Sequence, residues 1–259
     1  MPPIDWQAPW LAPLRELRRY LERDDWREAL AAAARERGVT TASGLPIFFA
    51  AADDAGDANY ETHIATSGRV PSRDNAHDRF NALVWLAWPR TKAALNARQA
   101  AELARDGVSG RRGPVRDAAT LIDESGLLLL ADAAAQAALR RLDWDWLFGR
   151  QRPRWGRDWL PFVFGHALLD KLTTPYKALT AAVVCLDGAA GDADAVAARW
   201  VHDTALAPPL LAHLPVLGVP GWWPANEDPA FYADTAVFRV HAAPGPRPTL
   251  AANRTEAEK

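Results

Sequence analysis

The sequence predicts a helix-dominated α+β fold, built as a single globular domain with a small β-hairpin or sheet component. Apolar residues recur at helical spacing in most of the chain, and only short runs such as residues 46–50 are typical of strands. The length of 259 residues fits one large domain, and no linker or internal repeat divides the chain. We predict a domain over residues 1–243 and a disordered tail over the proline-rich residues 244–259.

The first half of the chain is predicted to be mostly helical. Residues 10–21 carry leucines on one stripe, and a second helix begins after Asp24 or Asp25 and ends before Gly38. The apolar and aromatic residues 46–50 predict a strand. A helix over residues 75–88 is predicted to close at Pro89, and another continues to residue 105.

The second half mixes helices with a predicted hairpin. Residues 117–122 and 127–130 flank the sequence Asp-Glu-Ser-Gly, which predicts a β-hairpin with two carboxylates at its tip. We expect helices to residue 142, from Pro161 through His166, over residues 176–186 and over residues 192–206. Five prolines between residues 208 and 224 predict an irregular late segment.

Charge and composition limit the expected partners. A net charge of -2 gives no general attraction to nucleic acid or anionic lipid, so we expect a small-molecule substrate, no nucleic-acid partner and no membrane partner. The chain has no apolar run of membrane-span length and no signal-peptide pattern, which predicts a soluble, cytoplasmic protein. A weaker interpretation is a nucleic-acid binder that uses Arg111, Arg112, Arg150, Arg152, Arg154 and Arg157.

Ionisable residues lie beside apolar segments in three stretches, residues 73–81, 116–126 and 162–171, and such groups are costly to bury unless they are paired or used. His77 and Asn81 are four residues apart and share a helix face. His77 is near a helix N-terminus, which favours a neutral ring able to accept a proton or bind a metal. The alternative is a network at the helix start, with Asp74 as the N-cap.

His166 and Asp170 repeat the four-residue spacing in an apolar helix. Gly165 costs helix stability, which suggests a close approach by a ligand or by another backbone. The alternative is a buried structural histidine that bonds to Asp170 or to a carbonyl. Arg116, beside Asp117, predicts a structural ion pair.

Together these residues predict a hydrolase-type enzyme, with its pocket between the helices of the two histidines and two carboxylates at the rim. The candidate catalytic residues are His77, Asp78, Asn81, Asp123, Glu124 and His166. Histidine and carboxylate ligands favour a divalent ion such as zinc or manganese. The candidate metal ligands are His77, Asp117, Asp123 and His166. The alternative function is a non-catalytic ligand- or protein-binding protein that uses a tryptophan-rich surface, since the chain has 12 tryptophans.

Four blocks of this sequence resemble a bacterial family catalogued as domain of unknown function 3025. They are residues 70–96, with Val-Pro-Ser-Arg-Asp-Asn before His77, residues 116–126, residues 165–172 and residues 220–232. Asp170 is a departure, because the family has glutamate there. The resemblance covers most of the chain and implies an identity, without an activity.

Overall fold

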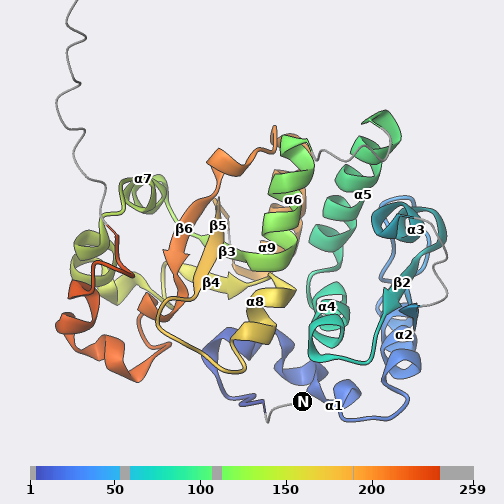
Figure 1. The fold of residues 1–259 in the computed structure, drawn as a ribbon, viewed down its shortest axis with the longest axis horizontal. Coiled ribbons are helices and arrows are strands. Elements are labelled where there is room, and N and C mark those ends of the chain that lie inside the picture. Colours follow the sequence, from blue (N-terminus) through green and yellow to red (C-terminus); the bar gives the residue numbers. More distant parts are fainter. Residues whose placement is uncertain (1–3, 53–58, 107–112, 189, 240–259) are drawn as a thin grey trace, which may run out of the picture.

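The computed structural model describes residues 4–52, 59–106, 113–188 and 190–239 (Figure 1). Helices dominate and strands form two small sheets, which confirms the predicted α+β class. The predicted tail, residues 244–259, lies outside the described residues.

The larger sheet has four strands in the order β4-β3-β5-β6. The central pair, β3 (Gly126–Leu130) and β5 (Thr180–Leu186), is parallel, and β4 (Leu160–Val163) and β6 (Ala212–Pro215) add antiparallel edges. All of β3 is buried, and its sequence is continuously apolar, as expected for a strand covered on both faces. The smaller sheet pairs β1 (Phe48–Ala51) with β2 (Arg69–Ser72) in parallel.

Five helices form the part of the fold that carries the polar stretches: three contain those stretches, a fourth packs against two of the three, and a fifth packs against the fourth. They are α4 (Ala76–Ala87), α5 (Pro89–Asp106), α6 (Pro114–Ser125), α8 (His166–Lys171) and α9 (Ala193–Asp203). Helix α6 packs against both the four-stranded sheet and α5, and α8 packs against α4 (Figure 1). The predictions for residues 75–88, 89–105 and 192–206 are confirmed, with Pro89 at the boundary between α4 and α5.

The remaining helices complete the shell. The predicted helix over residues 10–21 is a 3-10 helix, Pro9–Leu17, followed by α1 (Arg18–Leu21). Leu11, Leu14 and Leu17 are each three residues apart, which suits a 3-10 helix with three residues per turn. The others are α2 (Trp26–Glu36), α3 (Tyr60–Ser67), α7 (Ala133–Arg141), a π-helical turn at Asp145–Arg150, and the short 3-10 turns Arg152–Arg154, Ala190–Asp192, Pro208–Leu210, Val216–Gly218, Pro224–Glu227 and Pro229–Ala233.

The predicted hairpin is wrong. Residues 117–122 belong to α6, whose buried Ala118, Ala119 and Ile122 follow helical spacing, and the chain passes directly from that helix into β3. Residues 176–186, predicted as a helix, contain β5, and Pro161 lies in β4 rather than in the first turn of α8. A short apolar run fits a buried strand as well as a buried helix, so periodicity alone does not separate the two.

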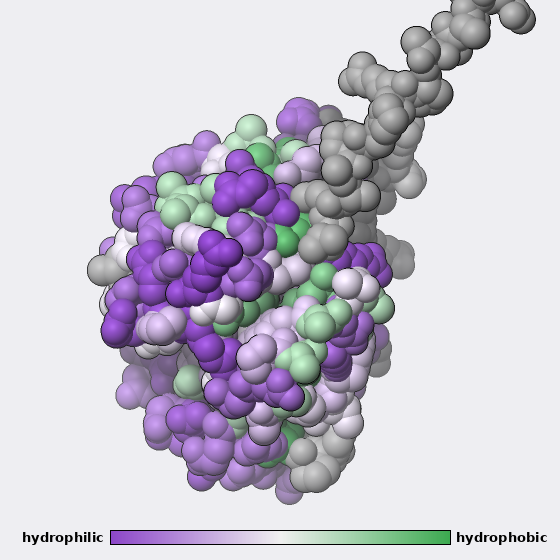
Figure 2. Space-filling view, turned by 90° about the vertical axis from the view of Figure 1, so that its left-hand side faces the viewer, coloured by the Kyte–Doolittle hydropathy of each residue, from purple (hydrophilic) through white to green (hydrophobic). Residues whose placement is uncertain are grey.

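One continuous apolar core extends from Ala8 to Phe238, and the tryptophan-rich segment belongs to it. Trp144, Trp155, Trp159 and Trp222 are buried, and Trp146 and Trp223 pack against the core. Figure 2 shows the side of the molecule that carries α7, where hydrophilic residues cover most of the surface around a paler, hollowed band. Within the described ranges, no helix is long and apolar enough to cross a membrane.

Candidate functional site

Two glycines bring α8 against the end of α6. The antiparallel pairing of β3 with β4 places the end of β4 beside Gly126, and Gly165 donates its N–H to the Gly126 carbonyl at 2.9 Å. A Cβ on Gly165 would lie 2.4 Å from the Gly126 nitrogen and 2.5 Å from the Ser125 nitrogen. Gly165 therefore serves close approach by another backbone, and this contact sets His166 beside the last turn of α6.

The N-terminus of α4 supplies the second histidine. Asn75 is the N-cap, because its side chain accepts from the Asp78 N–H at 2.8 Å. The predicted cap, Asp74, is wrong: its carboxylate instead accepts from Arg79. The cap fixes the first turn of α4, and His77 projects from this turn toward α6 and α8.

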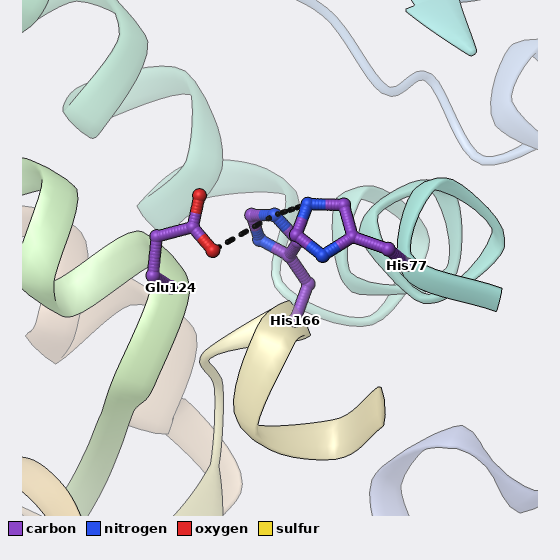
Figure 3. A group of neighbouring side chains, drawn as sticks. All are labelled: His77, Glu124 and His166. Carbon is purple, nitrogen blue, oxygen red and sulfur yellow. Dashed lines mark hydrogen bonds and ion pairs between the residues drawn. The ribbon is translucent and has the colours of Figure 1, made fainter. Parts of the chain in front are cut away.

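Three side chains converge where these helices meet (Figure 3). The Nε2 atoms of His77 and His166 are 3.0 Å apart, and Glu124 Oε2 lies 3.7 Å from His166 Nε2. One nitrogen of each ring and one carboxylate oxygen all lie within 4.8 Å of one another. The two imidazoles meet edge to face, with an angle of 74° between their planes. This geometry brings together three groups that can share a proton or bind a cation.

His166 is the most deeply buried member of this group. Burial lowers the pKa of His166 to about 4, so its ring is neutral at physiological pH. Among the described residues its Nδ1 atom has no hydrogen-bond partner, and Asp123 Oδ2 lies 3.7 Å away. Asp170, the predicted structural partner, makes no hydrogen bond to the ring in the part of the chain that is described. His166 instead faces α6 and α4.

Asp123 is held by a buried lysine. Lys92 Nζ donates to Asp123 Oδ1 at 2.5 Å and to Asn81 Oδ1 at 2.8 Å, and it lies 5.4 Å from the centre of the Trp85 ring. Burial works to raise the pKa of Asp123, but the charge of Lys92, together with its hydrogen bond and the nearby histidines, brings that pKa below its ordinary value. The carboxylate is therefore ionised beside His166.

Asn81 uses both ends of its amide within the protein. Its Nδ2 donates to the Tyr60 hydroxyl at 2.9 Å, and its Oδ1 accepts from Lys92. Burial raises the pKa of Tyr60 well above its ordinary value, so the phenol stays protonated. The arrangement gives Asn81 a positioning role, in which it fixes the Lys92 ammonium.

Asp78 and Asp117 lie outside the convergent group. Asp78 accepts from the backbone N–H of Arg73 at 2.7 Å and from its guanidinium at 3.0 and 3.2 Å. Burial opposes ionisation, but these hydrogen bonds hold the pKa of Asp78 below its usual range. Asp117 is in the first turn of α6 and does not line the pocket that the other candidates share. The side chains that lie close enough to share a cation are His77, Glu124 and His166, and Asp117 and Asp123 are not among them.

A polar pocket of about 490 Å³ opens beside the three convergent side chains. All six predicted catalytic residues line it, with contributions also from Tyr60, Glu61, Gln99, Arg116 and Thr120. The larger pocket, of about 620 Å³, lies between α7 and β6 and is lined mainly by apolar side chains; it contains none of the predicted site residues. The side chains predicted to be catalytic therefore all line the smaller pocket.

Glu61 and Lys92 also belong to the polar group around the pocket, although neither was predicted there. Glu61 accepts from Asn96 Nδ2 at 2.7 Å and from Gln99 Nε2 at 2.9 Å, and burial, aided by the Asp123 charge, raises its pKa to about 7. No local pattern marks this residue. Lys92 did carry a signal, because it is one of only four lysines in a chain that otherwise uses arginine for its cations.

The arginines considered for nucleic-acid binding have structural partners where they are described. Ion pairs join Arg150 to Asp145, Arg152 to Glu227, Arg154 to Asp132 and Asp158, and Arg157 to Asp158. Arg111 and Arg112 lie outside the described residues. The predicted ion pair of Arg116 with Asp117 is wrong, since neither side chain pairs with the other in the described structure.

Comparison with known families identifies the chain. Residues 47–242 match the family described as Protein of unknown function (DUF3025). The chain belongs to this family. The match includes His77, Glu124 and His166, so the whole convergent group falls inside the family region. Searches of the curated proteins and of the solved structures find no match.

Proposed function

We propose that this protein is a hydrolase in which His77, His166 and Glu124 hold a divalent metal ion at the wall of the polar pocket. The observation that carries the proposal is the convergence of two imidazole nitrogens and one carboxylate oxygen within 4.8 Å. Two histidines and one glutamate form a known ligand set of catalytic zinc, which leaves a coordination position open. Here the open side would be the pocket of about 490 Å³.

The distances fit this assignment. Two ligands bound tetrahedrally at about 2.0–2.1 Å from zinc lie roughly 3.3 Å apart. The observed separations are 3.0 Å between the two Nε2 atoms and 3.7 Å between His166 Nε2 and Glu124 Oε2. Small side-chain rotations would bring these two separations to the tetrahedral value, and the His77 nitrogen and the Glu124 oxygen, which lie within 4.8 Å of each other, would move closer together.

Helix dipoles support the same arrangement. Glu124 lies in the last turn of α6, where exposed carbonyls disfavour a second negative charge and favour a cation. Burial also raises the pKa of Glu124, and a bound cation would offset that cost. His77 lies in the first turn of α4, where the Asn75 cap fixes the backbone that carries its ring. The environment of Glu124 is therefore the one that a bound cation would stabilise.

The remaining residues would support the ligands. The Asp123 carboxylate faces Nδ1 of His166, the position from which a carboxylate orients a metal-bound histidine, and Lys92 fixes that carboxylate in turn. A divalent ion would supply a water whose pKa falls to about 7, which makes it a nucleophile at neutral pH. Glu61, whose pKa is about 7, lines the same pocket and can take up or release a proton in that range.

Metal content tests the site. Protein purified without chelator should contain close to one equivalent of zinc or manganese by elemental analysis, and His77→Ala and Glu124→Gln should each lose most of it. Asp117→Asn is the matched control, because it changes a carboxylate on the same helix outside the group, and it should keep the wild-type content. A metal-free wild-type protein whose melting temperature does not respond to added zinc or manganese would refute the metal site.

Activity tests the reaction class. The metal-loaded protein should hydrolyse at least one of an ester, an amide and a phosphoester probe, and a chelator should abolish that hydrolysis until metal is restored. A stoichiometric metal without hydrolysis of any probe would contradict the hydrolase assignment while leaving the metal site in place. Stoichiometric iron would point to the oxygen chemistry that two histidines and one carboxylate also support.

A further inference from the structure

Arg116 is a cation in the pocket that has no ion-pair partner among the described residues. It is the third residue of α6 and lines the pocket with a partly buried side chain. Its Nε atom is buried without a hydrogen-bond partner, and no carboxylate pairs with it within the described ranges. Arg73, the other arginine of this pocket, is already neutralised by Asp78.

Each of the other charged side chains around the pocket has a partner in the structure or a role in the proposed metal site. Lys92 neutralises Asp123, Arg73 neutralises Asp78, and Glu124 belongs to the proposed metal site. Glu61 shares its two carboxyl oxygens between Asn96 and Gln99. A buried donor without an acceptor is unfavourable. The Arg116 guanidinium is therefore expected to donate hydrogen bonds to a ligand in the pocket.

The position of Arg116 on α6 relates it to the reaction site. Arg116, Thr120 and Glu124 are four residues apart in succession, and all three line the pocket. One face of α6 thus forms a wall of the pocket from one end to the other. At 1.5 Å per residue, Arg116 and Glu124 are separated by roughly 12 Å along the helix axis.

We propose that Arg116 binds an anionic group of the substrate, a carboxylate or a phosphate, at the end of the pocket away from the bond that is cleaved, about 12 Å along α6 from Glu124. A guanidinium matches these oxyanions because its planar fork donates two parallel hydrogen bonds. The statement about the cleaved bond rests on the proposed function, whereas anion binding at Arg116 does not.

The first experiment measures anion binding on protein freed of metal by a chelator. Inorganic phosphate and propionate are titrated separately at constant ionic strength, with binding followed by calorimetry. At least one should bind saturably to a single site, and the stronger of the two identifies phosphate or carboxylate as the substrate group. Arg116→Gln should weaken that binding about tenfold or more, as expected for the loss of a charge-assisted bidentate contact.

Three further variants make the result specific. Arg116→Lys keeps the charge but loses the fork, so its affinity should lie between those of the wild type and Arg116→Gln. Arg35→Gln is the control, because Arg35 is an exposed helix residue without a side-chain partner among the described residues, and it should bind anions like the wild type. His77→Ala should also bind the anion normally, since the proposed anion site does not use the metal ligands.

The outcomes separate the two proposals. If neither anion binds saturably, or if Arg116→Gln binds as tightly as the wild type, the anion site is refuted, whatever the metal content. If anion binding depends on Arg116 while the protein holds no metal, the anion site stands and the metal-dependent hydrolase fails. If an ester probe is hydrolysed, Arg116→Gln should lower kcat/KM for a carboxylate-bearing ester by a larger factor than for a neutral acetate ester.

Discussion

Glu61 offers a direct test of the electrostatics of the pocket. Its carboxylate is held by Asn96 and Gln99, while burial and the charge of Asp123 raise its pKa from 4.5 to about 7. The folded protein therefore binds this proton more tightly than the unfolded chain does. As the pH rises from about 4.5 to about 7, the unfolded chain releases the proton first, so the free energy of unfolding falls across this window.

The magnitude follows from the pKa. A rise from 4.5 to about 7, at about 1.4 kcal/mol per pKa unit, amounts to roughly 3 kcal/mol when the carboxyl is fully ionised. Most of this change, about 2.5 kcal/mol, falls between pH 5 and pH 8. In a protein of this size it corresponds to a difference of about 5–10 °C in Tm.

Glu61→Gln removes the titration while keeping the shape of the side chain. The new amide turns an N–H₂ group toward Asn96 or Gln99, which shifts stability by a similar amount at every pH. The free energy of unfolding of wild type minus that of Glu61→Gln should therefore fall by about 2.5 kcal/mol from pH 5 to pH 8. Urea unfolding at four pH values in this range measures the difference, because all other titrating groups cancel.

Glu28→Gln is the matched control. Glu28 is an exposed glutamate in the first turn of α2, as Glu61 is in the first turn of α3. Its difference from the wild type should stay constant over the same pH range. Should the Glu61→Gln difference also stay constant to within about 0.5 kcal/mol, burial does not hold a proton on Glu61 and the reasoning fails.

Two other predictions concern the architecture of the site. Lys92→Met should lower the free energy of unfolding, measured with urea, by about 3–5 kcal/mol, because Asp123 would remain buried without its partner. Adding Asp123→Asn should recover part of this loss. A cost below about 1 kcal/mol would show that the ion pair is dispensable. Gly165→Ala should cost about 2 kcal/mol or more and reduce metal content, because its Cβ would lie 2.4 Å from the Gly126 nitrogen. Gly191→Ala, whose Cβ would meet nothing within 4 Å, is the control, and equal stabilities of the two variants would refute the close-approach argument.

The sequence by itself determined the fold class and most of the helices. Helical periodicity identified α2 and α9, each of which buries one face. Pro89 marked the boundary between α4 and α5, although α4 is buried almost all round. The sequence also indicated which polar stretches form the site, since buried ionisable groups are expensive and three such stretches lay beside apolar segments. His77 and His166, 89 residues apart, were expected in one pocket, and their rings do meet there.

Only the tertiary structure decided how those groups are used. Residues 117–122 were equally compatible with the first strand of a hairpin whose tip is residues 123–126. The packing of α6 between α5 and the sheet makes them a helix with Glu124 in its last turn. The local sequence pattern also could not predict which partner each of these neighbouring side chains would have, because the partner depends on which element each side chain faces. Asp123 meets Lys92, Glu124 meets the histidines, and Arg116 meets no carboxylate in the described structure, although all three share one helix. Partners distant in sequence set the charge state of a buried group, and those partners are fixed only when the chain is folded.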